Sequence, residues 1–302
     1  MNDQRSAIWR NAFRGICAAF IVFVLLCVYL WARQEHFIFF PEAEIRFTPA
    51  DYGLKFEETW LTVEGEKLYG WWIQGATEKV LLYLHGNGVN IGVNAEHAAR
   101  FQSLGMSVLL VDYRGYGRSE GAFPSEQSVY ADAEAMWKHL VKDRGIEPRN
   151  IFIYGHSLGS AIGIELALRH PNAAGLIVES AFTSIRDMAK RDLLFCAVPV
   201  SLILTQRFAS ISKIARLKLP VLFLHGSHDT LVPFSMSQRL YEAANEPKRV
   251  VLLAGGDHID SAAAAPRQFM EAIRDFASLT RTDESSDTEW KARTFPQTNL
   301  AK

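Results

Sequence analysis

The sequence predicts an α/β fold in which a mostly parallel β-sheet is flanked by helices on both faces. From residue 80 onward, short apolar segments of strand type alternate with longer segments of helical periodicity. Val80–Leu84 is apolar throughout, which is typical of an interior strand covered on both faces. Strands that alternate with helices form parallel sheets, because each helix carries the chain back across the sheet.

The predicted sheet begins with a hairpin of strands Trp60–Val63 and Leu68–Ile73 around the polar turn Glu64–Lys67. The alternation lapses at 181–219, which we interpret as a short helical cap insert, and no internal repeat is present. The other predicted elements are, in order, strand 80–84, helix 95–104, strand 108–111, helix 126–141, strand 151–154, helix 161–168, strand 175–178, strand 221–224, helix 234–244, strand 250–253 and helix 266–279.

Composition excludes several classes of function. The 302 residues are 49% hydrophobic and 22% charged with a formal net charge of -1, so electrostatics gives no reason to expect a nucleic-acid partner. The three cysteines, Cys17, Cys27 and Cys196, are too few and too scattered for a disulfide framework or a metal cluster.

An uncharged segment, Gly15–Ala32, predicts a transmembrane anchor. Its 18 residues would extend about 27 Å as a helix, close to the thickness of the bilayer hydrocarbon. Arg5, Arg10 and Arg14 precede it, and this positive charge predicts that residues 1–14 are cytoplasmic and the remaining chain is extracytoplasmic. The alternative is a cleaved signal peptide, for which the apolar segment is long and the cleavage pattern of small residues is absent.

The remaining chain divides into a domain at 36–280 and a polar tail at 281–302. The short apolar segment His36–Phe40 follows the anchor, and we expect it at the membrane surface before Pro41 turns the chain away. The tail has little apolar content and is predicted to be disordered.

The chemistry centres on a Gly-x-Ser-x-Gly pentapeptide at 155–159. A β-type segment enters it and an amphipathic helix leaves it, which is the pattern of a nucleophile elbow with Ser157 exposed on a tight turn. Gly155 and Gly159 are required because a side chain at either position would collide with the neighbouring strand or helix. The pentapeptide alone is a weak signal, and its strand and helix make it specific.

A serine hydroxyl needs a base, and the base needs an orienting carboxylate. Asp229 follows one predicted strand and His258 follows the next, so both should lie at the same sheet edge as Ser157. Asp257 is the alternative acid, but it adjoins His258 in sequence and its side chain should point away from the imidazole.

Two backbone N–H groups are candidates for stabilising the oxyanion. One belongs to Leu158, the residue after the nucleophile, and the other belongs to Asn87 in the loop His85–Gly88. Glycines on both sides of Asn87 would let this backbone approach the reacting atoms. The alternative for the loop is a glycine-rich turn that binds nothing.

These motifs together resemble the membrane-anchored Bem46 and ABHD13/ABHD17-like group of α/β-hydrolases, across about residues 36–279. The resemblance rests on Tyr83–Asn87, Asp112–Gly117, Gly155–Gly159, Pro220–Asp229 and Gly256–His258. It implies an eight-stranded α/β-hydrolase fold and a serine hydrolase that uses no metal and no organic cofactor. Members of the group cleave varied acyl bonds, including lipid esters and protein thioesters. The chain departs from it at Glu64-Gly65, where relatives often have Asp-Gly, and in lacking the cysteine cluster by which some are lipid-anchored.

Three functions stay open at this stage. The first is an acyl hydrolase of the carboxylesterase, lipase or acyl-thioesterase type, acting on small-molecule acyl esters or lipids near the membrane. The second is a serine peptidase, for which Glu179, Arg186 and Asp187 are the candidate groups that bind a peptide terminus. The third is a non-catalytic scaffold, which would not need Ser157, Asp229 and His258 together.

The cap insert contains many apolar residues, which must either be buried or line an acyl pocket. We choose Leu202 as the central residue for testing which holds. The residues concerned are Leu193, Leu194, Phe195, Val198, Val200, Leu202, Ile203 and Leu204.

We predict the topology from the positive charge that precedes the anchor. A reporter enzyme fused after Lys302 should be active only outside the cytoplasm, and N-terminal sequencing of the mature protein should find the first residues retained. Reporter activity in the cytoplasm, or a mature N-terminus near Arg33, would contradict this topology.

Overall fold

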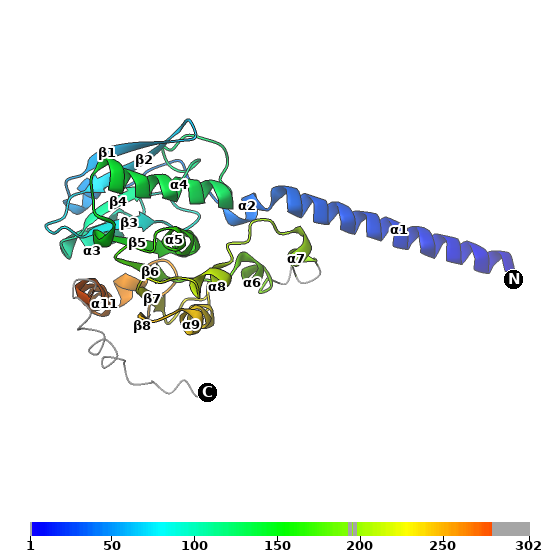
Figure 1. Ribbon diagram of the computed structural model, residues 1–302. Coiled ribbons are helices and arrows are strands. Elements are labelled where there is room, and N and C mark those ends of the chain that lie inside the picture. The colour runs from blue at the N-terminus through cyan, green and yellow to red at the C-terminus, as the bar shows by residue number, and fades with distance from the viewer. Residues whose placement is uncertain (1, 193–194, 196–197, 280–302) are drawn as a thin grey trace.

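A computed structural model describes residues 2–192, 195 and 198–279 and contains one eight-stranded sheet (Figure 1). The strand order is β1-β2-β4-β3-β5-β6-β7-β8. β2 pairs antiparallel with β1 and β4, and the other neighbours are parallel, which confirms the predicted mostly parallel sheet. The strands are β1 Glu57–Val63, β2 Glu66–Ile73, β3 Val80–Leu84, β4 Ser107–Val111, β5 Ile151–His156, β6 Gly175–Glu179, β7 Val221–Gly226 and β8 Lys248–Leu253.

Helices cover both faces of the sheet because the interior strands are apolar on both faces. Along β3, Leu82 and Leu84 face one core and Leu81 and Tyr83 face the other, as the two-residue period of a strand requires. Helices α4 Glu126–Lys138, α5 Leu158–Arg169, α8 Ser210–Ile214 and α9 Phe234–Ala243 cover the first face. Helices α3 Ala95–Ser103, α10 Ser261–Ala264 and α11 Pro266–Leu279 cover the second.

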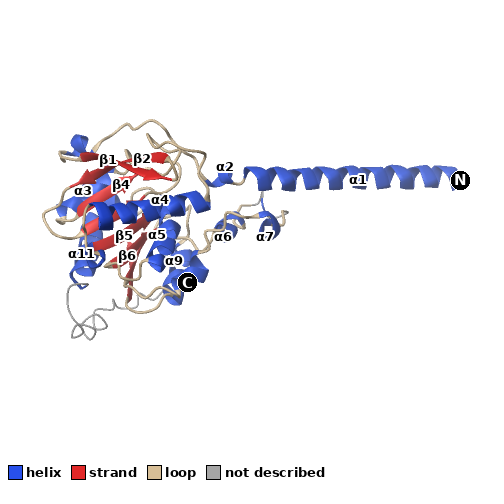
Figure 2. Ribbon diagram, turned by 45° about the horizontal axis from the view of Figure 1, so that its top comes forward, coloured by secondary structure: helices blue, strands red, loops and turns tan. Residues whose placement is uncertain are grey.

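The insert between β6 and β7 consists of short helices, as expected for a cap. Helices α6 Ile185–Ala189 and α7 Val200–Ile203 precede α8. In the two ribbon views α7 lies beside the C-terminal end of the N-terminal helix, and α6 lies next to α7 (Figures 1 and 2). The predicted disordered tail at 281–302 lies outside the described residues, as do Leu193 and Leu194 of the cap.

The N-terminal helix α1, Asn2–Arg33, projects away from the domain (Figure 2). Its segment Trp9–Arg33 is the one helix in the described part of the chain that is long and apolar enough to cross a membrane. Only 6% of its most apolar window is buried, whereas a core helix of a soluble protein would be mostly buried. The structure therefore contains a candidate membrane span that includes the predicted segment 15–32.

The expectation for His36–Phe40 is wrong in part. The chain forms a short helix α2, Glu35–Ile38, and then enters the domain. Phe39 is 1% exposed and packs edge-on against Phe208 with ring centroids 6.0 Å apart, and Ile38 is buried in the same core. Phe37 and Phe40 stay half-exposed. Part of this segment is therefore packed in the domain core and not at a membrane surface.

The loop after β4 contains a buried ion pair that fixes its shape. The guanidinium of Arg114 donates to Asp132 of α4 at 2.7 and 3.0 Å, and the Arg114 backbone N–H donates to the same carboxylate at 3.0 Å. The preceding residue, Tyr113, donates a hydrogen bond from its hydroxyl to the carbonyl of His85 at 3.1 Å. The motif 112–117 therefore supports the loop that carries Asn87.

We predict that Asp132→Asn lowers the free energy of unfolding by about 3 kcal/mol, because it leaves the buried guanidinium without its full counter-charge. Thermal unfolding of the full chain would measure the loss. Asp143→Asn is the matched control, since Asp143 pairs with His139 at the surface and its side chain is 67% exposed. Equal melting temperatures for the two variants would contradict a structural role for the buried pair.

Candidate active site

Ser157 occupies a strained turn between β5 and α5. Its φ of 51° and ψ of -116° lie in a backbone region that residues other than glycine rarely adopt. The backbone N–H of Ser157 donates to the Glu179 carbonyl of the neighbouring strand at 2.9 Å, which ties the turn to the sheet. A strained residue held in this way is a common feature of functional sites.

The two glycines of the pentapeptide allow this turn. A Cβ atom on Gly155 would collide with the Gly159 carbonyl oxygen, and a Cβ atom on Gly159 would collide with the Leu84 carbonyl oxygen of β3. The hydroxyl of Ser160 fills the remaining space and donates to Gly155 O at 2.8 Å. Glycine at both positions is therefore a steric requirement of the close contact between α5 and the sheet.

The structure brings Ser157, His258 and Asp229 into one hydrogen-bonded chain. Ser157 Oγ lies 3.0 Å from His258 Nε2, and His258 Nδ1 lies 2.8 Å from Asp229 Oδ2. The other carboxylate oxygen, Asp229 Oδ1, accepts the backbone N–H groups of Leu231 and Val232 at 3.0 and 2.8 Å. Asp229 is thus held in place by its own loop and presents its second oxygen to the imidazole.

Asp257, the alternative acid, lies in a different position. Its Oδ1 accepts the backbone N–H groups of Ile259 and Asp260, both at 3.0 Å, and so closes the turn that follows His258. The structure brings Asp229, not Asp257, to the imidazole.

The electrostatics of Asp229 suit a carboxylate that supports a cationic imidazole. Burial acts to raise its pKa, but the hydrogen bond and charge of His258, together with the hydrogen bond from the Val232 backbone, lower it more, so the pKa of Asp229 lies below its ordinary value. Asp229 is consequently ionised at neutral pH.

Among the described residues, no group of three or more His, Cys, Asp or Glu side chains is placed to hold a metal ion.

His156 makes a contact with the His258 loop that the sequence did not predict. Its Nε2 donates to the backbone carbonyl of His258 at 2.8 Å and so positions the loop that carries the imidazole. Burial lowers the pKa of His156 and so favours the neutral ring, which can still donate this bond from Nε2. His156 occupies the first x position of Gly-x-Ser-x-Gly, next to Ser157, so its place near the site could have been predicted. Nothing in the local sequence indicates its partner, which is 102 residues away.

Asn87 and Leu158, the two proposed oxyanion donors, line the same cavity as Ser157. Leu158 is the first residue of α5, where backbone N–H groups have no partner within the helix. The neighbouring Gly86 lies close to Ser157, since a Cβ atom there would lie 3.4 Å from Ser157 Cβ. The Asn87 side chain is used otherwise, because its Nδ2 donates to the Ile38 carbonyl at 2.8 Å.

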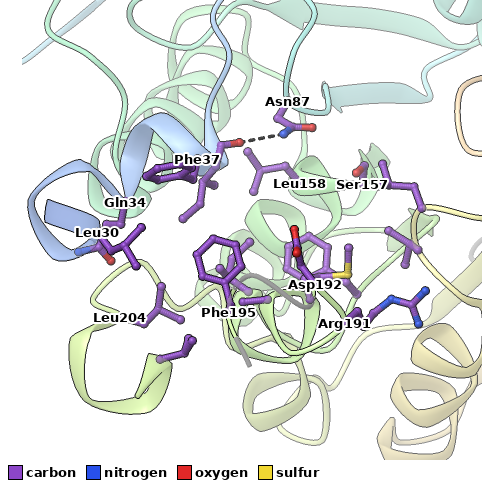
Figure 3. Close-up of a pocket in the computed structure, with 18 of the residues that line it drawn as sticks. Leu30, Gln34, Phe37, Asn87, Ser157, Leu158, Arg191, Asp192, Phe195 and Leu204 are labelled. Carbon is purple, nitrogen blue, oxygen red and sulfur yellow. Dashed lines mark hydrogen bonds between the residues drawn. The ribbon is translucent and has the colours of Figure 1, made fainter. Parts of the chain in front are cut away.

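A largely apolar cavity of about 810 Å³ opens at Ser157 (Figure 3). This volume is in the range of small-molecule binding sites. Three parts of the chain form its walls: the end of α1 with α2, the cap insert, and the loops at the sheet edge. The lining residues are Leu30, Gln34, Phe37, Ile38, Phe40, Asn87, Ser157, Leu158, Phe182, Ile185, Met188, Ala189, Arg191, Asp192, Phe195, Val200, Ile203, Leu204, Leu231 and Val232.

The apolar residues of the cap divide between the two roles considered above. Phe195, Val200, Ile203 and Leu204 line the cavity, and Val198 is buried beside it. Leu202 does neither, since it is 84% exposed. The choice of Leu202 as the central residue is therefore wrong, because α7 is too short for the sequence to indicate which of its faces is buried.

Comparison with known proteins identifies the family. A family model described as serine aminopeptidase, S33, matches residues 75–211. The alpha/beta hydrolase domain-containing protein WAV2 of Arabidopsis thaliana is 32% identical over 274 residues, covering 82% of this chain and 87% of WAV2. The chain belongs to the α/β-hydrolase family. An uncharacterized protein of Mycobacterium tuberculosis, Rv2307c, is 35% identical over 261 residues, with 84% of this chain and 90% of that protein covered.

A solved structure agrees with the fold. The esterase Pf2001 of Pyrococcus furiosus superposes on this α/β-hydrolase with a TM-score of 0.67 at 20% identity, covering 80% of this chain and 97% of the esterase. A likeness at this identity shows the fold. The predicted α/β-hydrolase fold and the resemblance to the family are both confirmed.

We predict that Asp229→Asn lowers kcat by about three orders of magnitude, because an amide can no longer stabilise the imidazolium. Asp257→Asn should lower it far less, since Asp257 binds only backbone N–H groups. Steady-state kinetics on a soluble acyl ester, with melting temperatures as a check on folding, would compare the two. A larger loss for Asp257→Asn would reverse the assignment of the acid.

Proposed function

We propose that this α/β-hydrolase is a membrane-anchored serine hydrolase that cleaves ester or thioester bonds of acyl or lipid-like substrates through an acyl-enzyme intermediate. The observation that carries the proposal is the hydrogen-bonded chain from Asp229 through His258 to Ser157, which ends at an apolar cavity. Such a cavity suits an acyl chain, because each buried methylene contributes up to about 0.8 kcal/mol of transfer free energy.

In the proposed first half-reaction, Ser157 Oγ attacks the carbonyl carbon of the substrate while His258 Nε2 accepts the hydroxyl proton. Asp229 stabilises the imidazolium that results. The backbone N–H groups of Asn87 and Leu158 stabilise the negative charge on the carbonyl oxygen. The leaving alcohol or thiol then takes the proton from His258, and the acyl group remains bonded to Ser157.

In the second half-reaction, water attacks the acyl carbon and gives its proton to His258. The tetrahedral intermediate collapses, the bond from the acyl carbon to Ser157 Oγ breaks, and His258 returns the proton to that oxygen. A carboxylic acid is released and the enzyme is restored, so neither a metal nor an organic cofactor is needed for the balance of this reaction.

The proposed location is the membrane, with the hydrolase domain on the extracytoplasmic side. Two observations support it: the exposed apolar helix Trp9–Arg33 and the arginines at 5, 10 and 14 that precede its apolar part. Small-molecule acyl esters or lipids near the bilayer surface are then the accessible substrates.

A serine peptidase is the second candidate, because the matching family model carries the description serine aminopeptidase. None of the three residues considered for binding a peptide terminus lines the described cavity. Glu179 is 2% exposed and accepts the Tyr154 hydroxyl at 2.6 Å, and Asp187 accepts the Thr183 hydroxyl at 2.7 Å. These three residues therefore do not support a site for a peptide terminus, and the charged residues that do line the otherwise largely apolar cavity are Arg191 and Asp192.

We predict that Ser157→Ala abolishes ester hydrolysis and labelling by a fluorophosphonate, while the melting temperature stays within about 2 °C, because one oxygen is lost and no packing. Ser212→Ala is the matched control, since Ser212 lies exposed on α8 away from the cavity. Residual esterase activity in the Ser157 variant, or a wild-type protein that does not label, would overturn the proposed nucleophile. Faster turnover of aminoacyl amides than of acyl esters would favour the peptidase.

A further inference from the structure

The end of the apolar helix is packed against the cap. Leu30 is 8% exposed, whereas Leu25 and Trp31 on the same helix are 61% and 54% exposed. Leu30 forms a small apolar cluster with Val198 and Val200 of the cap, and Phe195 and Leu204 pack against this cluster. Among the α1 residues whose exposure is described, Leu30 is the buried one, and the partly buried Cys27 packs against the same cluster. This end of α1 therefore has a specific contact with the domain.

Hydrogen bonds reinforce this contact at the first residue after the helix. Gln34 Oε1 accepts the backbone N–H groups of Thr205 and Gln206 at 2.8 and 3.1 Å, and Gln34 Nε2 donates to the Trp31 carbonyl at 2.8 Å. Gln206 Nε2 also donates to Glu35 Oε1 at 3.1 Å. Gln34 is only 9% exposed, so these hydrogen bonds are largely shielded from water.

This contact forms one wall of the cavity that contains Ser157. Leu30, Gln34 and Phe37 line one side, and Ser157 and Leu158 lie at the other (Figure 3). Leu30 falls within the candidate membrane span Trp9–Arg33, about 4.5 Å along the helix axis from its last residue. If α1 crosses a bilayer, the cavity begins at the boundary of the hydrocarbon.

Exposed apolar side chains surround the same region. Phe37 and Phe40 are 46% and 54% exposed at the cavity, and Leu202, on the cap helix that contacts α1, is 84% exposed. Exposed apolar residues gathered around a cavity mark a surface that contacts something apolar, and a bilayer at the end of α1 supplies this.

We infer that the membrane helix is one wall of the substrate site, with Leu30 as a specificity-determining residue, and that the acyl chain enters sideways from the adjacent leaflet. The substrate class is then a membrane-resident lipid whose long acyl chain is held as an ester or thioester. This inference rests on the proposed function, because it needs the cavity at Ser157 to be the acyl site.

The first test uses the full-length protein in phosphatidylcholine vesicles with 4-nitrophenyl acetate and 4-nitrophenyl dodecanoate as substrates. In Leu30→Trp the larger side chain should occupy part of the cavity and lower kcat/KM for the dodecanoate by at least about tenfold. The value of kcat/KM for the acetate should stay within about twofold of wild type. Leu25→Trp is the matched control and should change neither, because Leu25 is exposed and lies away from the cavity.

Leu30→Ala provides a second variant that does not depend on fitting a larger side chain. It widens the cavity, so the chain length at which kcat/KM stops rising should increase. Equal losses for acetate and dodecanoate in both Leu30 variants, with a lower melting temperature, would show that Leu30 is only structural and would overturn the inference.

The second test concerns the route of entry. Wild-type protein should cleave a fluorescent phospholipid that does not exchange between vesicles when the lipid shares its vesicle, and should leave it intact in separate vesicles. Cleavage at similar rates in both would mean entry from water and would overturn lateral entry. Failure of the proposed function is distinguishable, because acetate hydrolysis would then be absent or would persist in Ser157→Ala.

Discussion

The close contact between α5 and the sheet is the constraint on which the rest of the site depends. Gly155 and Gly159 allow backbone atoms of α5, β5 and β3 to touch, and Ser157 between them has a positive φ. Such strain costs about 1 to 3 kcal/mol and persists only when surrounding bonds hold it. The Ser160 hydroxyl and the bond from Ser157 N–H to Glu179 do so here. A serine on this turn is then reached by loops from β3, β7 and β8 together.

The parallel sheet explains why so much of the candidate site could be predicted from the sequence. Ser157, Asp229 and His258 each follow an apolar strand, and parallel strands place their carboxyl ends at one edge. The distinction between Asp229 and Asp257 also followed from local geometry, since a residue next to an imidazole in sequence cannot easily face it. What could be predicted here depended on short-range patterns and one rule of topology.

The remaining features depend on contacts that no local pattern encodes. Gln34 bonds to backbone groups at Thr205 and Gln206, 171 and 172 residues later in the chain. Phe39 was expected at the membrane surface because His36–Phe40 is apolar, but an apolar segment suits a membrane and a protein core equally. In the four-residue helix α7, the buried Val200 and the exposed Leu202 are indistinguishable by residue type.

The bonds of Gln34 have a consequence for biochemical work on this protein. A fragment that begins after Arg33 would keep the sheet, the turn at Ser157 and the hydrogen-bonded chain of Ser157, His258 and Asp229. It would lack Leu30, and its Gln34 would sit at a free chain end with little to hold it against Thr205 and Gln206. Such a fragment would have one side of the cavity open where the intact chain has a wall, so its substrate preference would describe the fragment and not the intact chain.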